Sequence, residues 1–124
     1  MEEEKIKDII RNAYIRGIHI SPSWDAVRTG FDAGFRMLVL DGSAVTETSL
    51  EDFVNPRVEK LRENPGAFDM EVEYEIPLVD IEGNAATVRI EIIRDGVHVY
   101  TDYMLLYKID GSWRIVSKIY HSHP

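Results

Sequence analysis

The sequence contains no cysteine in its 124 residues, which excludes disulfide bonds, thiolate metal ligands and cysteine nucleophiles. The stability of the fold must therefore come from packing and hydrogen bonds. No apolar run approaches the roughly 20 residues that a membrane-spanning helix needs. The segment from Met1 to Glu4 is acidic through its three glutamates, whereas a signal peptide begins with basic residues. These absences predict a cytoplasmic protein that does not enter a membrane.

Basic residues are also scarce, since 14 lysines and arginines stand against 22 aspartates and glutamates and the formal net charge is −8. A chain of this charge repels the phosphates of nucleic acids, so a nucleic-acid partner is not expected. The hydrophobic fraction of 44%, with 10% aromatic residues, is enough for one sizeable core. The sequence shows no repeat, low-complexity tract or linker, and we expect a single domain over residues 1–124.

Apolar residues recur at helical spacing in the first half of the chain. One such stretch runs from Glu3 to about Ile20 and predicts a first helix. Ser21 is a suitable cap for a second helix, and residues 35–48 predict a short hairpin after it. Ser49 is a suitable cap for a third helix, which we expect to be interrupted at Pro56 because proline lacks the backbone donor.

Strand patterns dominate the second half of the chain. Residues 68–76 alternate apolar with acidic side chains. A two-residue turn at Asp95-Gly96 pairs Arg89 with Asp102, and we expect a three-residue loop after Asp110. These pairings place the following side chains on the inner face of the sheet: Val88, Ile90, Val99, Thr101, Tyr103, Leu105, Trp113, Ile115, Ser117, Ile119 and His121.

Long antiparallel strands need a covering layer for their apolar face, and the helices of the first half can supply it. The sequence therefore predicts an α+β fold in which three N-terminal helices pack on a curved antiparallel sheet. This order of elements is similar to the nuclear transport factor 2-like, or cystatin-like, superfamily. The segments Tyr14–His19, Tyr100–Tyr103 and Lys108–Val116, with His121 near the end, resemble its branch named Putative lumazine-binding, close to the SnoaL-like proteins. The resemblance covers nearly the whole chain and implies a cone-shaped domain.

The resemblance also implies an apolar interior, in which superfamily members described as ketosteroid isomerases and polyketide cyclases use an aspartate base and a tyrosine. Tyr14 matches the isomerase tyrosine on the first helix. However, Val39 and Leu105 stand where the two isomerase acids would be. Asp32 follows Phe31 where branch members often carry a histidine. The resemblance alone therefore assigns no reaction to the chain.

Aromatic and polar-tipped side chains expected to face inward define a candidate ligand pocket. Within it, His19 and His121 are candidates for proton transfer, with Tyr14 as a hydrogen-bond donor. The same residues are more simply explained as hydrogen-bonded parts of the core. The candidate pocket consists of Tyr14, His19, Trp24, Phe31, Phe35, Tyr74, Thr101, Tyr103, Ser117 and His121.

Neither a metal site nor a cofactor is expected. His121 and His123 lie on a terminal tail without a third ligand nearby, which we interpret as a solvated terminus. No phosphate-loop, dinucleotide or zinc-protease spacing occurs. The outer sheet face, in contrast, is too apolar for solvent, so we expect a homodimer packed through it. Its predicted residues include Tyr100, Met104, Leu106, Val116 and Tyr120.

Three functions remain open on these grounds. The favoured one is a protein without a cofactor that binds a small apolar or heteroaromatic molecule between the helices and the sheet. The second is an isomerase, cyclase or dehydratase that works by proton transfer, using His19, His121 and Tyr14. The third is a dimeric interaction module whose interior is filled by its own side chains.

Overall fold

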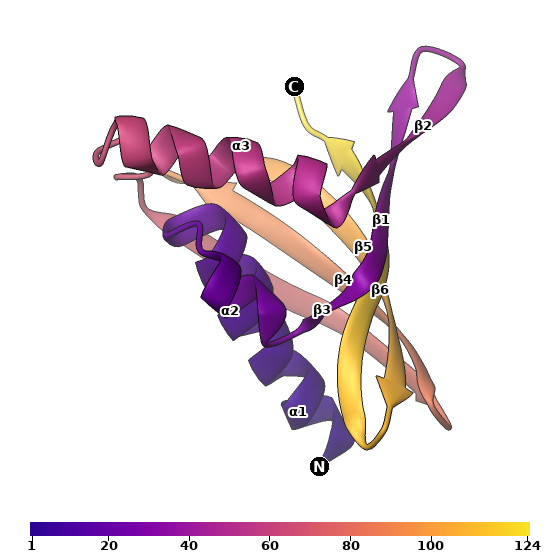
Figure 1. The fold of residues 1–124 in the computed structure, drawn as a ribbon. Coiled ribbons are helices and arrows are strands. Elements are labelled where there is room, and N and C mark those ends of the chain that lie inside the picture. The colour runs from indigo at the N-terminus through magenta and orange to yellow at the C-terminus, as the bar shows by residue number, and fades with distance from the viewer.

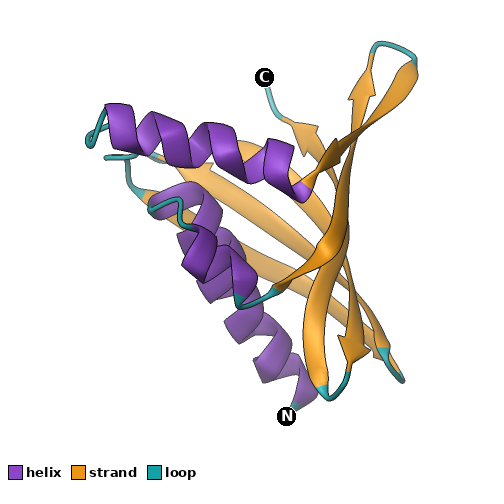
Figure 2. Cartoon of the chain, viewed as in Figure 1, coloured by secondary structure: helices purple, strands orange, loops and turns teal.

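A computed structural model describes all residues from 1 to 124. The helices lie inside the curve of one six-stranded sheet, which gives the molecule the shape of a cone (Figure 1, Figure 2). The predicted α+β architecture is confirmed. In chain order the elements are α1 (Glu2–Ile9), η1 (Ile10–Ile20), α2 (Trp24–Arg28), β1 (Phe31–Asp41), β2 (Ala44–Ser49), α3 (Leu50–Glu63), β3 (Val72–Glu82), β4 (Ala85–Arg94), β5 (Val97–Ile109) and β6 (Ser112–Ser122).

The first predicted helix consists of two parts, because α1 continues into the π-helical segment η1. At its end the Ser21 amide donates to the Arg16 carbonyl at 2.9 Å, a bond that spans five residues. In an α-helix, residues five apart point about 140° away from each other, whereas a π-helix brings them onto one side. The rings of Tyr14 and His19 accordingly meet edge to face, with centroids 4.9 Å apart.

Two of the helix expectations were wrong. The cap of α2 is Ser23 rather than Ser21, and its hydroxyl accepts from the Ala26 amide at 3.4 Å. Pro56 does not interrupt α3, which runs unbroken through it (Figure 1). A proline inside a helix costs one backbone bond, and in α3 the burial of Phe53 and Val54 on the inner side offsets that cost.

The sheet has the strand order β2-β1-β6-β5-β4-β3. All neighbours are antiparallel except β1 and β6, which run parallel and join Phe31 to Ile115 in register. The β1–β2 hairpin projects beyond the rest of the sheet (Figure 1). This arrangement leaves the inner side of β4, β5 and β6 facing α1, η1 and α3.

Two single-residue bulges change which side chains of β5 and β6 face inward. Val99 is an extra residue on β5, because Ile92 pairs with Tyr100 but Ile93 pairs with His98. Val116 is an extra residue on β6, because Leu106 pairs with Ile115 but Leu105 pairs with Ser117. A one-residue slip exchanges the two faces of a strand.

The predicted faces were therefore wrong over most of β5 and over the second half of β6. Tyr103, Leu105 and Ile119 are on the outer face and 38%, 49% and 51% exposed. Their places inside are taken by residues predicted to face outward, of which Met104 and Leu106 are almost fully buried. Before the second bulge, Trp113 and Ile115 are buried as expected. The expected three-residue loop was wrong, however, because Ile109 pairs with Ser112 and only Asp110 and Gly111 form the turn.

The core fills the space between the helices and the sheet with 21 buried hydrophobic residues. Close approach of the first helix to the start of β1 depends on Gly30, since a Cβ there would lie 2.6 Å from atoms of Ile9 and Ala13. At the narrow end, the indole of Trp113 donates a hydrogen bond to Glu2 and ties the N-terminal turn to β6. None of the helices combines the length and the apolar character needed to cross a lipid bilayer.

Candidate functional site

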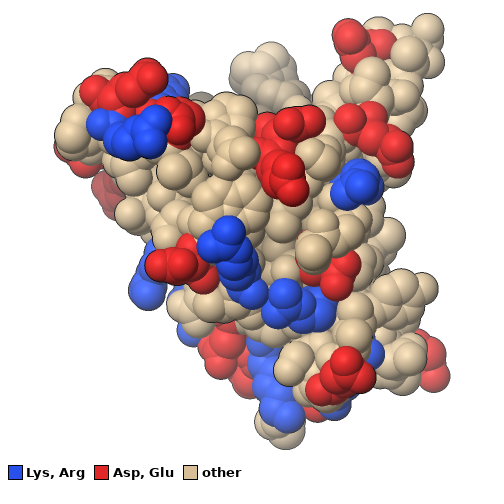
Figure 3. Space-filling model, in the orientation of Figure 1, with Lys and Arg blue, Asp and Glu red and all other residues tan.

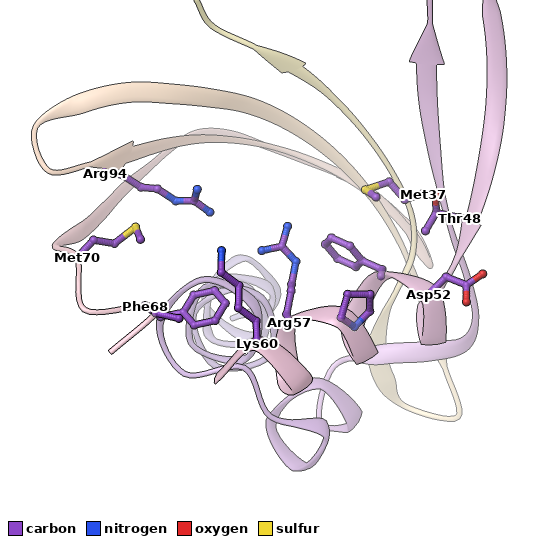
Figure 4. A pocket seen from close by; sticks show the side chains of 11 residues that line it. Met37, Thr48, Asp52, Arg57, Lys60, Phe68, Met70 and Arg94 are labelled. Atoms are coloured by element: carbon purple, nitrogen blue, oxygen red, sulfur yellow. The ribbon is translucent and has the colours of Figure 1, made fainter. Parts of the chain in front are cut away.

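An open cavity of about 400 Å³ lies between α3 and the far end of β4. Its apolar wall includes Met37, Phe53 and Phe68, and the basic side chains of Arg57, Lys60 and Arg94 converge on it from opposite sides (Figure 4). A smaller chamber of about 50 Å³ continues it toward the core. The two spaces share three lining residues, Met37, Phe53 and Arg57.

A buried group of three polar side chains lies next to the small chamber, and one of them, Lys118, lines it. The Tyr14 hydroxyl donates a hydrogen bond to Oδ2 of Asp102. The Lys118 ammonium group lies 3.5 Å from Oδ1 of the same carboxylate. Asp102 and Lys118 are 0% and 5% exposed, and Lys118 also lines the small chamber. A buried ion pair of this kind is costly to desolvate and is often found where it has a function.

His19 completes the inner chamber from η1. Its Nδ1 accepts a hydrogen bond from an Nη of Arg94 at 2.8 Å, which makes Nε2 the protonated nitrogen of a neutral ring. Nε2 is buried without a protein partner, as are Nε of Arg94 and Oδ1 of Asp102 outside its ion pair. Buried polar groups are normally hydrogen-bonded, so the Nε2 hydrogen of His19, a residue that lines the small chamber, is a candidate donor to a polar ligand.

Burial sets the electrostatics of the site. It lowers the pKa of Lys118 to about 8, although the neighbouring Asp102 opposes this shift. Burial raises the pKa of the Asp102 carboxyl and that of the Tyr14 hydroxyl. Burial and the nearby charge of Lys118 lower the pKa of His19 well below its usual value. Burial thus disfavours the charged form of each group, which keeps the Tyr14 hydroxyl protonated and the His19 ring neutral at neutral pH.

The charges at the cavity differ from those of the surface. On the side seen in Figure 3, acidic and basic side chains are interspersed, and the tip of the β1–β2 hairpin carries acidic ones. At the cavity, Arg57, Lys60, Arg94 and Lys118 face only Asp52 and Asp102. Within a chain of net charge −8, the cavity is therefore locally basic.

The structure places only part of the predicted pocket in this cavity. His19 lines the small chamber at its inner end, whereas Tyr14 is fully buried and reaches the site only through its ring contact with His19. Phe35 is fully buried between the rings of Phe31 and Phe53 and serves as core. Trp24 and Phe31 line a separate hollow of about 480 Å³, where the Trp24 indole donates to Asn55. Tyr74 packs against the core, and its hydroxyl accepts from Arg11 at 3.3 Å.

Four residues predicted for the pocket do not line it. Tyr103 and His121 are exposed on the outer face, and Ser117 is half-buried beside the second bulge. The Thr101 hydroxyl bonds to Glu91 instead of facing the interior. His19 and His121 therefore do not form the pair that the sequence suggested. The two bulges are the physical reason, since they turn these four side chains away from the cavity.

The residues missed by sequence reasoning are Asp102, Lys118, Arg57 and Arg94. Asp102 lies within the Tyr100–Tyr103 segment that carries the family resemblance, and this was the available signal. It was overlooked because the assumed register paired it with Arg89 on the outer face, whereas it pairs with Ile90. The sequence could not show that Asp102 on β5 and Lys118 on β6 are both buried.

Comparisons with known proteins agree with this fold. A protein of unknown function from Shewanella baltica is 25% identical, with a TM-score of 0.77, and the match covers 99% of this chain and 94% of that one. One from Silicibacter pomeroyi is 17% identical, with a TM-score of 0.77 and coverage of 98% and 96%. A domain with a cystatin-like fold from Nostoc punctiforme is 15% identical, with a TM-score of 0.63 and coverage of 98% and 77%. The first two are described as nuclear transport factor 2-like.

A short segment also resembles a curated protein, the aldolase FrzH of a Cladobotryum species. The identity is 64% over 25 residues, and the match spans a fifth of each chain. The family model described as Putative lumazine-binding, in contrast, matches residues 1–121. Since this match covers nearly the entire sequence, the chain belongs to the Putative lumazine-binding family, within the nuclear transport factor 2-like superfamily.

Proposed function

We propose that the protein binds a small heteroaromatic molecule that carries an anionic group. The proposal rests on the two guanidinium groups of Arg57 and Arg94 at the cavity and on the buried Nε2 of His19, which has no protein partner. The cavity volume of about 400 Å³ is within the usual range for small-molecule sites of roughly 300–1,000 Å³.

The chemistry of the walls favours this class of ligand. Phe53 and Phe68 offer aromatic surfaces in the larger cavity, on which a flat ring can pack. Arg57 and Arg94 offer guanidinium groups that pair with a carboxylate or phosphate. The Nε2 hydrogen of His19 can donate to a ring carbonyl in the small chamber. The family description is consistent with a heteroaromatic ligand of this kind.

Pterin and 6-carboxypterin, which differ only by a carboxylate, test the proposal. We expect 6-carboxypterin to bind at least about tenfold more tightly, because a charge-assisted hydrogen bond contributes roughly 1.5–3 kcal/mol. Arg57→Met and Arg94→Met should each remove most of that difference in fluorescence titrations. The control Arg28→Met alters an arginine of the separate hollow and should leave it unchanged.

Three further results would speak against this assignment. Equal affinity for the two pterins would contradict the anionic group, and a loss of binding in Arg28→Met would place the ligand in the other hollow. His19→Ala should weaken binding, whereas His121→Ala on the outer face should not. No thermal shift with any heteroaromatic compound would favour the interaction module.

A second candidate function is proton-transfer catalysis, and the group formed by Tyr14, Asp102 and Lys118 favours it. A buried carboxylate with a raised pKa can remove a proton next to a carbonyl, while the free Nε2 hydrogen of His19 donates to the enolate oxygen. The short likeness to an aldolase is compatible with enolate chemistry. Proton magnetic resonance in deuterium oxide distinguishes the candidates, since only an enzyme exchanges the α-protons of a bound carbonyl compound.

We further propose that two copies pair through the outer face of the sheet, which no helix covers (Figure 1). Leu78, Tyr103, Leu105, Tyr107 and Ile119 are exposed there, replacing the residues first predicted. Light scattering should report about twice the chain mass of 14.3 kDa. Leu105→Glu should give a monomer, whereas Leu40→Glu on the projecting hairpin should not; a monomeric parent protein would contradict the pairing.

A further inference from the structure

Two histidines and a glutamate meet at one end of the outer sheet face, away from the cavity. Glu91 lies on β4, His98 near the start of β5, and His123 just after β6. One nitrogen of each imidazole and one carboxylate oxygen lie within 4.8 Å of one another. The rings of His98 and His123 are 4.0 Å apart between centroids. Glu91 and His123, which are 32 positions apart in the chain, thus bring their possible metal-ligand atoms close together.

The backbone fixes all three positions. The β6 strand continues to Ser122, which pairs with Tyr100, and the His123 amide then donates to the Val99 carbonyl at 2.9 Å. The expected solvated terminus was therefore wrong for His123, which is half-buried and bonded through its backbone to β5. The partners that His123 lacked in the sequence are Glu91 and His98, which the β4–β5 hairpin brings beside it.

Neighbouring side chains orient the glutamate. Arg89 donates to Oε2 of Glu91 at 2.8 Å, while His98 donates to Oε1 at 3.0 Å. Thr101 also donates to Oε1, and its hydroxyl lies 2.9 Å from Nε2 of His123. One carboxylate oxygen is thus held by arginine and the other faces the two imidazoles. Hydrogen bonds from neighbouring side chains to a metal ligand fix its orientation.

The donor set is that of a transition-metal site. Two imidazoles and one carboxylate are ligands that Zn²⁺ accepts in tetrahedral geometry, with the fourth position left for water. Zinc–ligand bonds of about 2.0–2.1 Å put donor atoms roughly 3.4 Å apart, which small rotations of the side chains can reach. His98 is exposed and His123 half-buried, so both rings are free to make them.

We propose that Glu91, His98 and His123 bind one divalent transition-metal ion, best matched by Zn²⁺. The site is separate from the ligand cavity and does not depend on the function proposed for it. Because it is open to solvent and Arg89 lies beside the glutamate, its affinity should be lower than that of a closed structural zinc site.

Titration of the chelator-treated full chain with ZnCl₂ in a calorimeter tests this proposal. We expect saturable binding of one ion per chain, together with a rise in melting temperature. With Co²⁺ as a second probe, the visible absorption bands of a four- or five-coordinate ion should appear. His98→Ala and Glu91→Gln should each weaken Zn²⁺ binding by about tenfold or more. The control Glu73→Gln removes an exposed carboxylate from the neighbouring strand β3 and should retain full binding.

Circular dichroism of each variant separates loss of metal from loss of fold, and His98 is exposed enough for its replacement to fold normally. Absence of Zn²⁺ binding to the parent protein would overturn the proposal. So would unchanged affinity in His98→Ala, which would point to isolated histidines as adventitious ligands. A stoichiometry of several ions per chain would overturn it for the same reason.

Discussion

Replacing Asp102 with alanine should lower the free energy of unfolding by about 3–5 kcal/mol. The substitution leaves the Lys118 ammonium group buried without a counter-charge and the Tyr14 hydroxyl without its acceptor. Both residues are nearly inaccessible to solvent, so water cannot replace the lost carboxylate. Urea denaturation at neutral pH, followed by circular dichroism, measures the change.

Two variants serve as controls for this experiment. Asp80→Ala removes an exposed aspartate from β3 and should change stability by less than about 0.5 kcal/mol. The double variant Asp102→Leu/Lys118→Met removes both charges, and should recover most of the stability lost in the single variant. If Asp102→Ala were as stable as the parent protein, the buried ion pair described above could not be present.

Acidification should destabilise the protein through His19. Its pKa in the folded state lies well below the unfolded value of about 6.5, chiefly because the ring is buried. Below pH 6.5 the unfolded chain therefore binds a proton that the native ring does not accept. Stability is fully present above that pH and falls by up to about 1.4 kcal/mol for each pH unit below it, until the folded pKa is reached.

The contribution of His19 can be isolated by subtraction, because the raised pKa of Asp102 changes stability in the opposite direction. Unfolding free energies of the parent protein and of His19→Asn, measured from pH 7.5 to 5, should converge as the pH falls. Asparagine can still accept from Arg94 but does not titrate. The exposed His121→Asn variant should follow the parent curve, and parallel curves for His19→Asn would refute this account.

The order of helices and strands could be predicted from sequence because it depends on local patterns. Alternation of side chains identified β3 and β4, and the Asp-Gly pairs identified the turns around positive backbone angles at Asp95 and Asp110. Burial of Trp113 and Ile115 followed from the same patterns. The family resemblance added the curvature of the sheet, which no local pattern contains.

The composition of the site could not be predicted, because it depends on Val99 and Val116. Each is an ordinary β-branched strand residue, and nothing in its side chain distinguishes a bulged position from a paired one. A bulge nevertheless moves every later residue to the other face. This is why Asp102 and Lys118 were assigned to the surface and Tyr103 and His121 to the pocket.

Other differences arise from tertiary context. The π-helical geometry of η1 adds no hydrophobic signature of its own, yet it brings His19 under Tyr14. Pro56 was expected to end a helix on local grounds, and packing of that helix against the sheet overrides the local preference. The meeting of His98 with His123 needs both the hairpin register and the full length of β6.

The parallel contact between β1 and β6 has a consequence for how the protein is made. Phe31 leaves the ribosome early, but its partner Ile115 belongs to the last strand of the chain. Until β6 has emerged, the β1–β2 hairpin cannot pair with the rest of the sheet. The apolar side of the helices then lacks a complete sheet to pack against. Such long-range pairing is slow, and the folding intermediates that precede it expose apolar surface and are prone to aggregate. Acquisition of the native state is therefore deferred until β6 has been synthesised.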